Sequence, residues 1–190
     1  MKNAIILHGE PSKKEYYDPE APSMSNAHWI PWLQGQLLKH DIAAATPEVP
    51  HSFDRNWKVW TKEVERYEIT PETILVGHST GSGYFIKYLS IHPKLKVGKV
   101  VLVAPWLDPY KDKTKDFFDD FEIDPDFPKR TKGVTVFASD DDEDSVQKTV
   151  EIIRARVKDI KYKEFHNYGH FCYDDLETNE FPELLEEILE

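Results

Sequence analysis

Short apolar runs alternate along the chain with longer amphipathic stretches. Runs of aliphatic and β-branched residues without polar alternation are typical of parallel strands that helices cover on both faces. They predict such strands at Ala4–Leu7, Thr73–Val76, Val100–Ala104 and Val134–Ala138. A weaker strand is predicted at Ala43–Thr46, and the alternation within Ile160–Phe165 predicts a half-exposed edge strand.

The amphipathic stretches between these runs predict helices. Trp29, Leu33 and Leu37 share one helical stripe, and Trp57 and Trp60 share another, so these tryptophans are interpreted as core residues. We expect helices at Trp29–Lys39, Asp54–Tyr67, Ser79–Ile91, Ser145–Val157 and Phe181–Leu189. This alternation of strands and helices predicts the α/β class, as a three-layer α/β/α sandwich around a mostly parallel sheet of about six strands.

Composition narrows the class of protein. A chain of 190 residues, 39% of them hydrophobic, is expected to form a single domain over residues 1–190. Its net charge of −11 disfavours nucleic acid as a partner, because an acidic surface repels phosphates. The first apolar run is too short for a signal peptide, and no later run is long enough to span a membrane. With Cys172 as the only cysteine, no intrachain disulfide can form, and the cytoplasm is the expected location. The oligomeric state, monomer or dimer, is left open.

The most informative segment is Gly77-His78-Ser79-Thr80-Gly81, a G-x-S-x-G pattern between a predicted strand and a predicted helix. A serine on so sharp a turn adopts a strained backbone conformation, and glycines two residues to either side relieve the crowding. Its hydroxyl is then exposed at the carboxyl edge of the sheet. The alternative is a serine that only caps the helix, which explains less of this context. We therefore predict that Ser79 is a nucleophile.

A serine hydroxyl needs a base to accept its proton. His170 follows the last predicted strand and precedes the last predicted helix, which brings its imidazole to the edge where Ser79 is expected. His166 is a rival, but it lies nearer the strand end, whereas the base normally comes from the loop beyond the strand. The two histidines could also form a metal pair, but Gly169 disfavours a helix there and no third ligand is suitably spaced.

An acid must orient and stabilise the imidazolium. The acidic segment Ser139–Asp144 follows the penultimate strand, and a plain solvated loop is the alternative interpretation for most of its carboxylates. We predict Asp142 as the acid and keep Asp141 as the second candidate. Asp108, after the preceding strand, is a further candidate.

The same acidic segment also has the spacing of a calcium loop. Asp140, Asp142 and Asp144 occupy its first, third and fifth positions, and Glu151 its last. Ser145 stands where such a loop requires glycine, and a strand instead of a helix leads into it, so calcium is disfavoured. We expect no metal and no cofactor.

Acyl transfer also requires N–H donors for the developing oxyanion. One is expected from the backbone of Thr80, the residue after the nucleophile. The other is expected from Glu10 in the loop after the first strand, because Gly9 allows a close approach and Pro11 has no N–H; an ordinary glycine turn is the alternative there. The substrate-binding site is expected to include His8, Gly9, His78 and Trp106.

The chain resembles, over nearly its whole length, the retinoblastoma-binding-protein-9-like serine hydrolases, a small branch of the α/β-hydrolases. The stretches His-Trp-Ile-Pro-Trp-Leu at 28–33 and Phe-Ala-Ser-Asp-Asp-Asp at 137–142 are the more particular ones. The resemblance also includes Ile6–Gly9, Val100–Ala104, the G-x-S-x-G elbow at 76–81 and Gly-His-Phe at 169–171. The last two are shared with many hydrolases. The resemblance implies an α/β-hydrolase fold without a large lid and a carboxylesterase-like or peptidase-like activity on small substrates. It also implies Asp142 as the acid and His170 as the base.

Two departures from that family matter. The residues after Asp142 do not give the usual apolar-Pro ending, which keeps Asp141 open as the acid. The Leu-x-Cys-x-Glu element for binding retinoblastoma protein is absent, because His170 stands two positions before Cys172. That partner is therefore not carried over.

Two functions are compared. The first is a hydrolase of a small-molecule ester or amide, which acts through an acyl-enzyme on Ser79. The second is a catalytically weak or inactive protein-interaction module, motivated by the acidic and aromatic segment Pro105–Lys132 with Phe117–Phe121. Aromatic residues there and in Glu10–Ala27 either form a modest substrate mouth or pin surface loops to the core. The complete set of triad candidates favours the enzyme.

Overall fold

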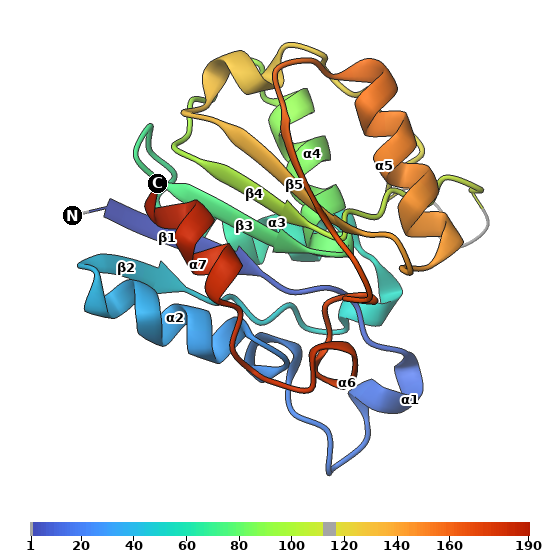
Figure 1. Ribbon diagram of the computed structural model, residues 1–190. Helices are drawn as coiled ribbons and strands as arrows, with labels where there is room; N and C mark the ends of the chain where they lie inside the picture. Colours follow the sequence, from blue (N-terminus) through green and yellow to red (C-terminus); the bar gives the residue numbers. More distant parts are fainter. Residues whose placement is uncertain (1, 112–116) are drawn as a thin grey trace.

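A computed structural model describes residues 2–111 and 117–190 (Figure 1). One sheet has the strand order β2-β1-β3-β4-β5-β6, and every neighbouring pair is parallel. Its strands are β1 (Lys2–Leu7), β2 (Ile42–Ala45), β3 (Ile74–His78), β4 (Val100–Val103), β5 (Val134–Ser139) and β6 (Lys161–Phe165). The predicted six-stranded α/β/α sandwich is confirmed, and so is the position of the last strand at a sheet edge.

Helices cover both faces of the sheet (Figure 1). The longer ones are α2 (Ile30–Lys39), α3 (Trp57–Val64), α4 (Thr80–Ile91), α5 (Asp144–Arg156) and α7 (Pro182–Leu189). The short ones are α1 (Lys13–Tyr16), α6 (Tyr173–Leu176) and the 3-10 turns η1 (Met24–Asn26), η2 (Ser52–Asp54) and η3 (Phe127–Arg130). Helices α2 and α7 lie together on one face, where the rings of Trp29 and Phe181 meet edge to face. Among the described residues, no helix is both long and apolar enough to cross a membrane.

The direction of winding reverses between β1 and β3. From β1 the chain passes to β2 on one side, and it later returns to β3 on the other side of β1. Right-handed crossovers in opposite directions place their helices on opposite faces, so α2 lies across the sheet from α4. The carboxyl ends of β1 and β3 then lie side by side without a crossing helix between them, which is where α/β sheets bind their ligands.

The sequence patterns predict where most of the elements lie, but they miss the exact residues at which several helices begin. The helix expected from Asp54 begins only at Trp57, because the Asn56 side chain accepts hydrogen bonds from the N–H groups of Lys58 and Val59 and so caps it. Ser79 occupies the N-cap position, just outside α4, and its side chain makes no capping hydrogen bond. Helices α1 and α6 were not expected, since four-residue helices are too short to show periodicity.

The core contains the tryptophans that the helical stripes predicted. Trp29 and Trp60 are fully buried, and Trp57 is half-buried. Trp60 meets the rings of Tyr84 and Phe117. The interpretation of these residues as core is therefore confirmed.

Aromatic residues after β4 also belong to the core. Phe117, Phe118 and Phe127 are buried, and the Nζ of the buried Lys87 donates to the Phe117 carbonyl oxygen at 2.7 Å. These side chains therefore pin the segment to the body of the protein and do not line a mouth. The part of this segment at residues 112–116 lies outside the described residues.

Helix α7 is held to the sheet by a buried carboxylate. Glu187 accepts hydrogen bonds from Thr135 Oγ1 at 2.7 Å and pairs with Lys161 and Lys163 at 2.8 and 2.9 Å. Burial favours the neutral acid, but the hydrogen bonds of Lys161, Thr135 and Lys163 outweigh it and lower the pKa of Glu187 to about 2. The alternating lysines of the edge strand thus face a helix and are not simply solvated.

Candidate active site

Ser79 lies at the turn between β3 and α4 with a strained backbone conformation. Its φ and ψ are 54° and −119°, in a region that a residue with a side chain adopts only when its surroundings impose it. Its N–H donates to the Val103 carbonyl oxygen at 2.9 Å, and its own carbonyl oxygen accepts from Gly83 and Trp106 at 3.1 and 3.2 Å. Bonds to β4, to α4 and to the segment after β4 therefore fix this turn.

The two glycines of the pattern are required by close backbone contacts. A Cβ at Gly77 would lie 2.5 Å from the Ser82 backbone nitrogen, and a Cβ at Gly81 would lie 2.5 Å from the carbonyl oxygens of Leu7 and His8. Neither contact is possible for a larger residue without a shift of the backbone. The turn can therefore bend this sharply, and the end of β1 can approach it, only with glycine at both positions.

The loop after β1 faces the Ser79 hydroxyl. A Cβ built on Gly9 would lie 3.6 Å from Ser79 Oγ and 3.0 Å from its Cβ. The next residue, Glu10, pairs through both carboxylate oxygens with the Arg55 guanidinium. The guanidinium carbon also lies over the Trp106 ring, 5.5 Å from its centroid. The Glu10 side chain is thus anchored beside the residue that bonds the Ser79 carbonyl.

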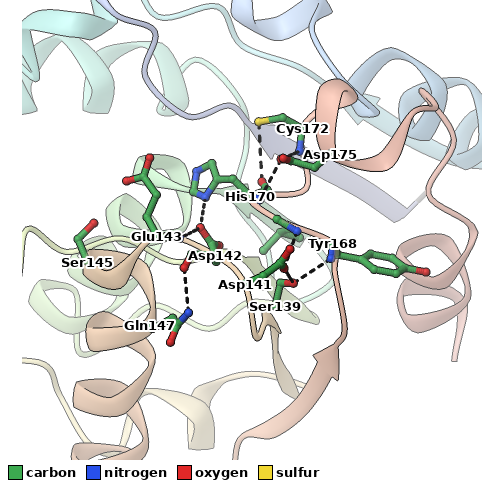
Figure 2. A network of polar contacts seen from close by, with 12 residues as sticks. Ser139, Asp141, Asp142, Glu143, Ser145, Gln147, Tyr168, His170, Cys172 and Asp175 are labelled. Carbon is green, nitrogen blue, oxygen red and sulfur yellow. Dashed lines mark hydrogen bonds and ion pairs between the residues drawn. The ribbon is translucent and has the colours of Figure 1, made fainter.

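His170 lies with its imidazole beside that of the residue that precedes Ser79. It belongs to the segment between β6 and α6, and its ring centroid is 5.0 Å from that of His78, the residue before Ser79. Its Nδ1 makes a 2.8 Å hydrogen bond with Asp142 Oδ1, from the loop after β5 (Figure 2). Among the described residues, neither Ser79 Oγ nor His170 Nε2 makes a hydrogen bond, with the other or with a third group, and the ring of His170 is bonded through Nδ1 alone.

The electrostatics of His170 are set by two opposing effects. Burial lowers the pKa of the imidazole, but the hydrogen bond and negative charge of Asp142 outweigh it, so the pKa is raised above 6.5. The Asp142 carboxylate is itself buried, with 1% of its side chain exposed. This pair can accept a proton and hold the resulting positive charge.

Each carboxylate of the acidic segment has a different partner. Asp140 Oδ2 bonds His166 Nδ1 at 2.6 Å, and Asp141 Oδ1 accepts from the Gly169 N–H at 2.9 Å. Figure 2 shows Asp141 turned towards Ser139, away from the His170 ring. Asp142 is therefore the carboxylate that contacts the imidazole. Like charges so close together repel one another, and the separate partners of these carboxylates offset that repulsion.

The alternative roles considered for these residues are not favoured by the geometry. His166 is 81% exposed and pairs with Asp140, on the rim of the molecule and not at the Ser79 turn. The calcium interpretation requires Asp140, Asp142 and Asp144 to converge, but they bond His166, His170 and Tyr110 respectively. Among the residues that the structure describes, no cluster of His, Cys, Asp and Glu could hold a metal ion.

His8 and His78 were expected beside the substrate, but both rings are buried and occupied. His8 Nε2 accepts from the Val49 N–H at 3.1 Å, and its Nδ1 bonds the Gly9 carbonyl oxygen. His78 Nε2 donates to the His170 carbonyl oxygen at 2.8 Å. Their side chains therefore hold loops in place and have little exposed surface for a ligand. Trp106 is also mostly buried, with 6% of its surface exposed.

The predicted oxyanion donors, the N–H groups of Thr80 and Glu10, belong to the two segments that meet at Ser79. Thr80 is the first residue of α4, so its N–H has no acceptor within the helix. Glu10 follows Gly9, whose backbone approaches Ser79. Their role stays a prediction.

Sequence reasoning missed two residues of this site, Arg55 and Asp175. Arg55 fixes Glu10, and Asp175 Oδ2 accepts hydrogen bonds from the N–H groups of His170 and Cys172 at 2.9 and 3.0 Å. Arg55 lies in an irregular segment with no motif. Asp175 stands three positions after Cys172, the N-cap residue of α6, which is the spacing of a capping box. Cysteine is not a usual capping residue, so no motif marked it.

Residues 22–185 match the serine hydrolase family. The hydrolase YdeN of Bacillus subtilis (strain 168) is 27% identical over 160 residues, which are 80% of this chain and 82% of that protein. The crystal structure of the B. subtilis ydeN product has a TM-score of 0.80 at 23% identity and is matched over 100% of this chain and 97% of its own.

More distant structures share the architecture. Est1E of Butyrivibrio proteoclasticus with bound ferulic acid has a TM-score of 0.66 at 15% identity, over 100% of this chain and 88% of its own. XC6422 of Xanthomonas campestris, described as an α/β serine hydrolase without a lid, has a TM-score of 0.56 at 12% identity, over 98% and 78%. At these identities the likeness establishes the fold, that of an α/β-hydrolase without a large lid.

Proposed function

Because the chain belongs to the serine hydrolase family, we propose that it cleaves a small ester or amide through an acyl-enzyme on Ser79. The observation that carries this proposal is the hydrogen bond between His170 and the buried Asp142, beside a strained Ser79 turn. Within the family, the motifs at 28–33 and 137–142 favour the retinoblastoma-binding-protein-9-like branch.

The proposed reaction proceeds in two halves. Ser79 Oγ attacks the substrate carbonyl carbon while its proton passes to His170 Nε2, and the carbonyl oxygen becomes an oxyanion. The N–H groups of Thr80 and Glu10 stabilise this oxyanion. The intermediate expels the alcohol or amine, which takes the proton from His170. Water then attacks the acyl-enzyme with His170 again as base, and the carboxylic acid is released.

Asp142 has a distinct role in both halves. It keeps the proton of the neutral imidazole on Nδ1, so that Nε2 faces Ser79 as an acceptor. When Nε2 takes the serine proton, the negative charge of Asp142 stabilises the imidazolium. The raised pKa of His170 is the equilibrium expression of this stabilisation.

The substrate class follows from the open edge of the sheet. The described loops supply short segments around Ser79 and no second domain, which favours a short acyl group over a long lipid chain. Est1E, one of the proteins of the same fold, was crystallised with ferulic acid, a small carboxylic acid. A carboxylesterase-like activity is therefore proposed here, with a small amide as the second substrate class.

Covalent labelling tests the nucleophile directly. A fluorophosphonate probe is expected to label the wild-type protein and Ser145→Ala, in which another serine at the same edge is removed. Ser79→Ala is expected to remain unlabelled and to lose hydrolysis of p-nitrophenyl acetate. Labelling that persists in Ser79→Ala would refute the assignment.

The alternative function, a protein-interaction module, predicts the opposite result of the labelling experiment. It expects an unreactive Ser79 in the wild-type protein. Its motivation was the aromatic surface around Phe117–Phe121, but Phe117 and Phe118 are buried. Esterase activity that depends on Ser79 would exclude it.

A further inference from the structure

The segment from His166 to Cys172, here called the base loop, has an unusual backbone. Asn167, Gly169 and Phe171 all lie in the left-handed region, with φ of 61°, 49° and 58°, so His170 stands between two such residues. A non-glycine residue in this region is disfavoured relative to ordinary conformations and persists only where neighbouring structure imposes it. The base loop therefore depends on contacts from outside itself.

The first half of the base loop is held by the loop after β5. The N–H groups of Asn167, Tyr168 and Gly169 donate to side chains of that loop at 3.1, 3.0 and 2.9 Å. Their acceptors are Asp140 Oδ1, Ser139 Oγ and Asp141 Oδ1. The acidic segment thus fixes the backbone that leads to His170, as well as its ring.

The backbone of His170 itself is held from two other elements. Its N–H donates to Asp175 Oδ2 of α6 at 2.9 Å (Figure 2), and its carbonyl oxygen accepts from His78 Nε2 of β3 at 2.8 Å. The same Asp175 oxygen accepts from the Cys172 N–H. One carboxylate and one imidazole therefore bond both peptide groups of the residue whose ring Asp142 holds.

Each of these two side chains is fixed by its own surroundings. His78 is 2% exposed and meets the Trp29 and His28 rings edge to face at 5.6 and 5.8 Å. Burial holds the pKa of His78 well below 6.5, so the ring is neutral and donates through Nε2. A Cβ at Gly169 would lie 2.5 Å from Asp175 Cγ, so glycine is needed for the carboxylate to reach the loop.

We propose that His78 and Asp175 are positioning residues that hold the His170 backbone from both sides and so aim Nε2 at Ser79. The inference rests on the proposed function. It gives His78 a role other than contact with substrate, and it gives Asp175 a role that no sequence motif indicated. Proton transfer tolerates little displacement, because a shift of about 1 Å can cost on the order of 100-fold in rate.

The test separates the hydrogen bonds of Asp175 from its charge. Asp175→Ala removes both, Asp175→Asn keeps an oxygen acceptor, and Asp174→Asn removes an adjacent charge without a bond to His170. We expect kcat/KM for p-nitrophenyl acetate to fall about 100-fold in Asp175→Ala and to be largely restored in Asp175→Asn. It should stay at the wild-type value in Asp174→Asn. KM should change less than kcat, since no bond to substrate is lost.

A pH profile supplies a readout that simple destabilisation would not move. The groups that act electrostatically on or with His170 are Asp142, Glu143, Asp175, His28 and His78. The negative charge of Asp175 raises the pKa of His170, so the acidic limb of kcat/KM should move to lower pH in Asp175→Asn. It should not move in Asp174→Asn.

His78 is tested by the pair His78→Leu and His78→Gln. Glutamine retains an N–H donor, so it should recover part of the activity that leucine loses. If Asp175→Ala folds poorly, the titration of the His170 ring can instead be followed by NMR in Asp175→Asn. Ser79→Ala, which keeps Asp175, is the reference for this measurement. Wild-type kcat/KM in Asp175→Ala, or an unmoved titration in Asp175→Asn, would overturn the inference. Absence of Ser79 labelling in the wild-type protein would instead overturn the proposed function.

Discussion

Ser79 and the residues flanking His170 adopt backbone conformations that an unfolded chain rarely visits. The strain at Ser79 leaves a trace in the sequence, because the tight contacts of Gly77 and Gly81 exclude every side chain. The strain around His170 leaves a weaker trace, since Asn167 and Gly169 are residue types found in turns of many kinds and Phe171 is not typical of a left-handed turn. At the residue scale, a motif is readable where glycine is the only residue that fits.

The acid can be assigned by comparing adjacent carboxylates. Asp142→Asn is expected to lower kcat by a factor on the order of 10³–10⁴, because the neutral imidazole loses its orienting partner. Asp141→Asn should cost much less, since Asp141 bonds the Gly169 N–H and an amide oxygen can still accept that bond. Steady-state kinetics on both variants measure the difference. A greater loss in Asp141→Asn would reverse the assignment.

The pH dependence of activity follows from the state of His170. The base acts in its neutral form, and its pKa is raised above 6.5, so kcat/KM should fall as the pH drops through a value above 6.5. Asp142→Asn removes the carboxylate that does most to raise the pKa of His170, and burial, which lowers this pKa, then counts for more. The acidic limb of that variant should therefore move to lower pH. A profile that is flat from neutral pH down to pH ~5 would contradict His170 as the base.

At the scale of the elements, the candidate site is formed by the ends of strands and by the loops that follow them. The carboxyl ends of β1 and β3 are adjacent because the winding reverses between them. This brings the Gly9–Glu10 loop to Ser79, although these residues are far apart in sequence. Helix α6 supplies Asp175 and was not foreseen, because a four-residue helix has no periodic signal.

The loop after β1 depends on a contact from the segment after β2. Arg55→Met removes the pairing with Glu10 and leaves the Glu10 backbone less firmly placed, so kcat/KM should fall about 10-fold, less than the full loss of an oxyanion donor. Arg154→Met is a matched control, because Arg154 also pairs with a glutamate and lies over a tyrosine ring, away from Ser79. Equal effects of the two substitutions on p-nitrophenyl acetate hydrolysis would argue against this role of Arg55.

At the scale of the whole molecule, the last helix, α7, is attached to the sheet by Glu187. This side chain bonds residues of both β5 and β6. Glu187→Gln is expected to lower the free energy of unfolding by about 3 kcal/mol at pH 7, because it removes the charge of a buried carboxylate with which Lys161 and Lys163 pair. Glu186→Gln, on the exposed side of the same helix, should have little effect. Urea unfolding followed by circular dichroism measures both.

The same carboxylate predicts how stability changes with pH. The pKa of Glu187 is lowered from 4.5 to about 2 on folding. Its contribution is therefore complete above about pH 4.5 and declines as the pH falls towards 2. The difference between the wild-type protein and Glu187→Gln should shrink on going from pH 7 to pH 4. A difference that grows at low pH would contradict this account.

The sequence by itself determined the order of strands and helices, the buried tryptophans and the elbow pattern, because these depend on periodicity and on local sterics. It also limited the acid to a few adjacent residues. It could not choose among them, since which carboxylate reaches the imidazole depends on how two loops from different strands pack together.

Only the tertiary structure decided the partners of each polar group. Asp140, Asp141 and Asp142 are chemically identical in the sequence, and they differ in the groups that the base loop brings to them. His78 and His8 likewise became buried supports of loops instead of substrate contacts. Hydrogen bonds between residues far apart along the chain have no signature in sequence periodicity. Their partners are determined only when the loops pack together at the edge of the sheet.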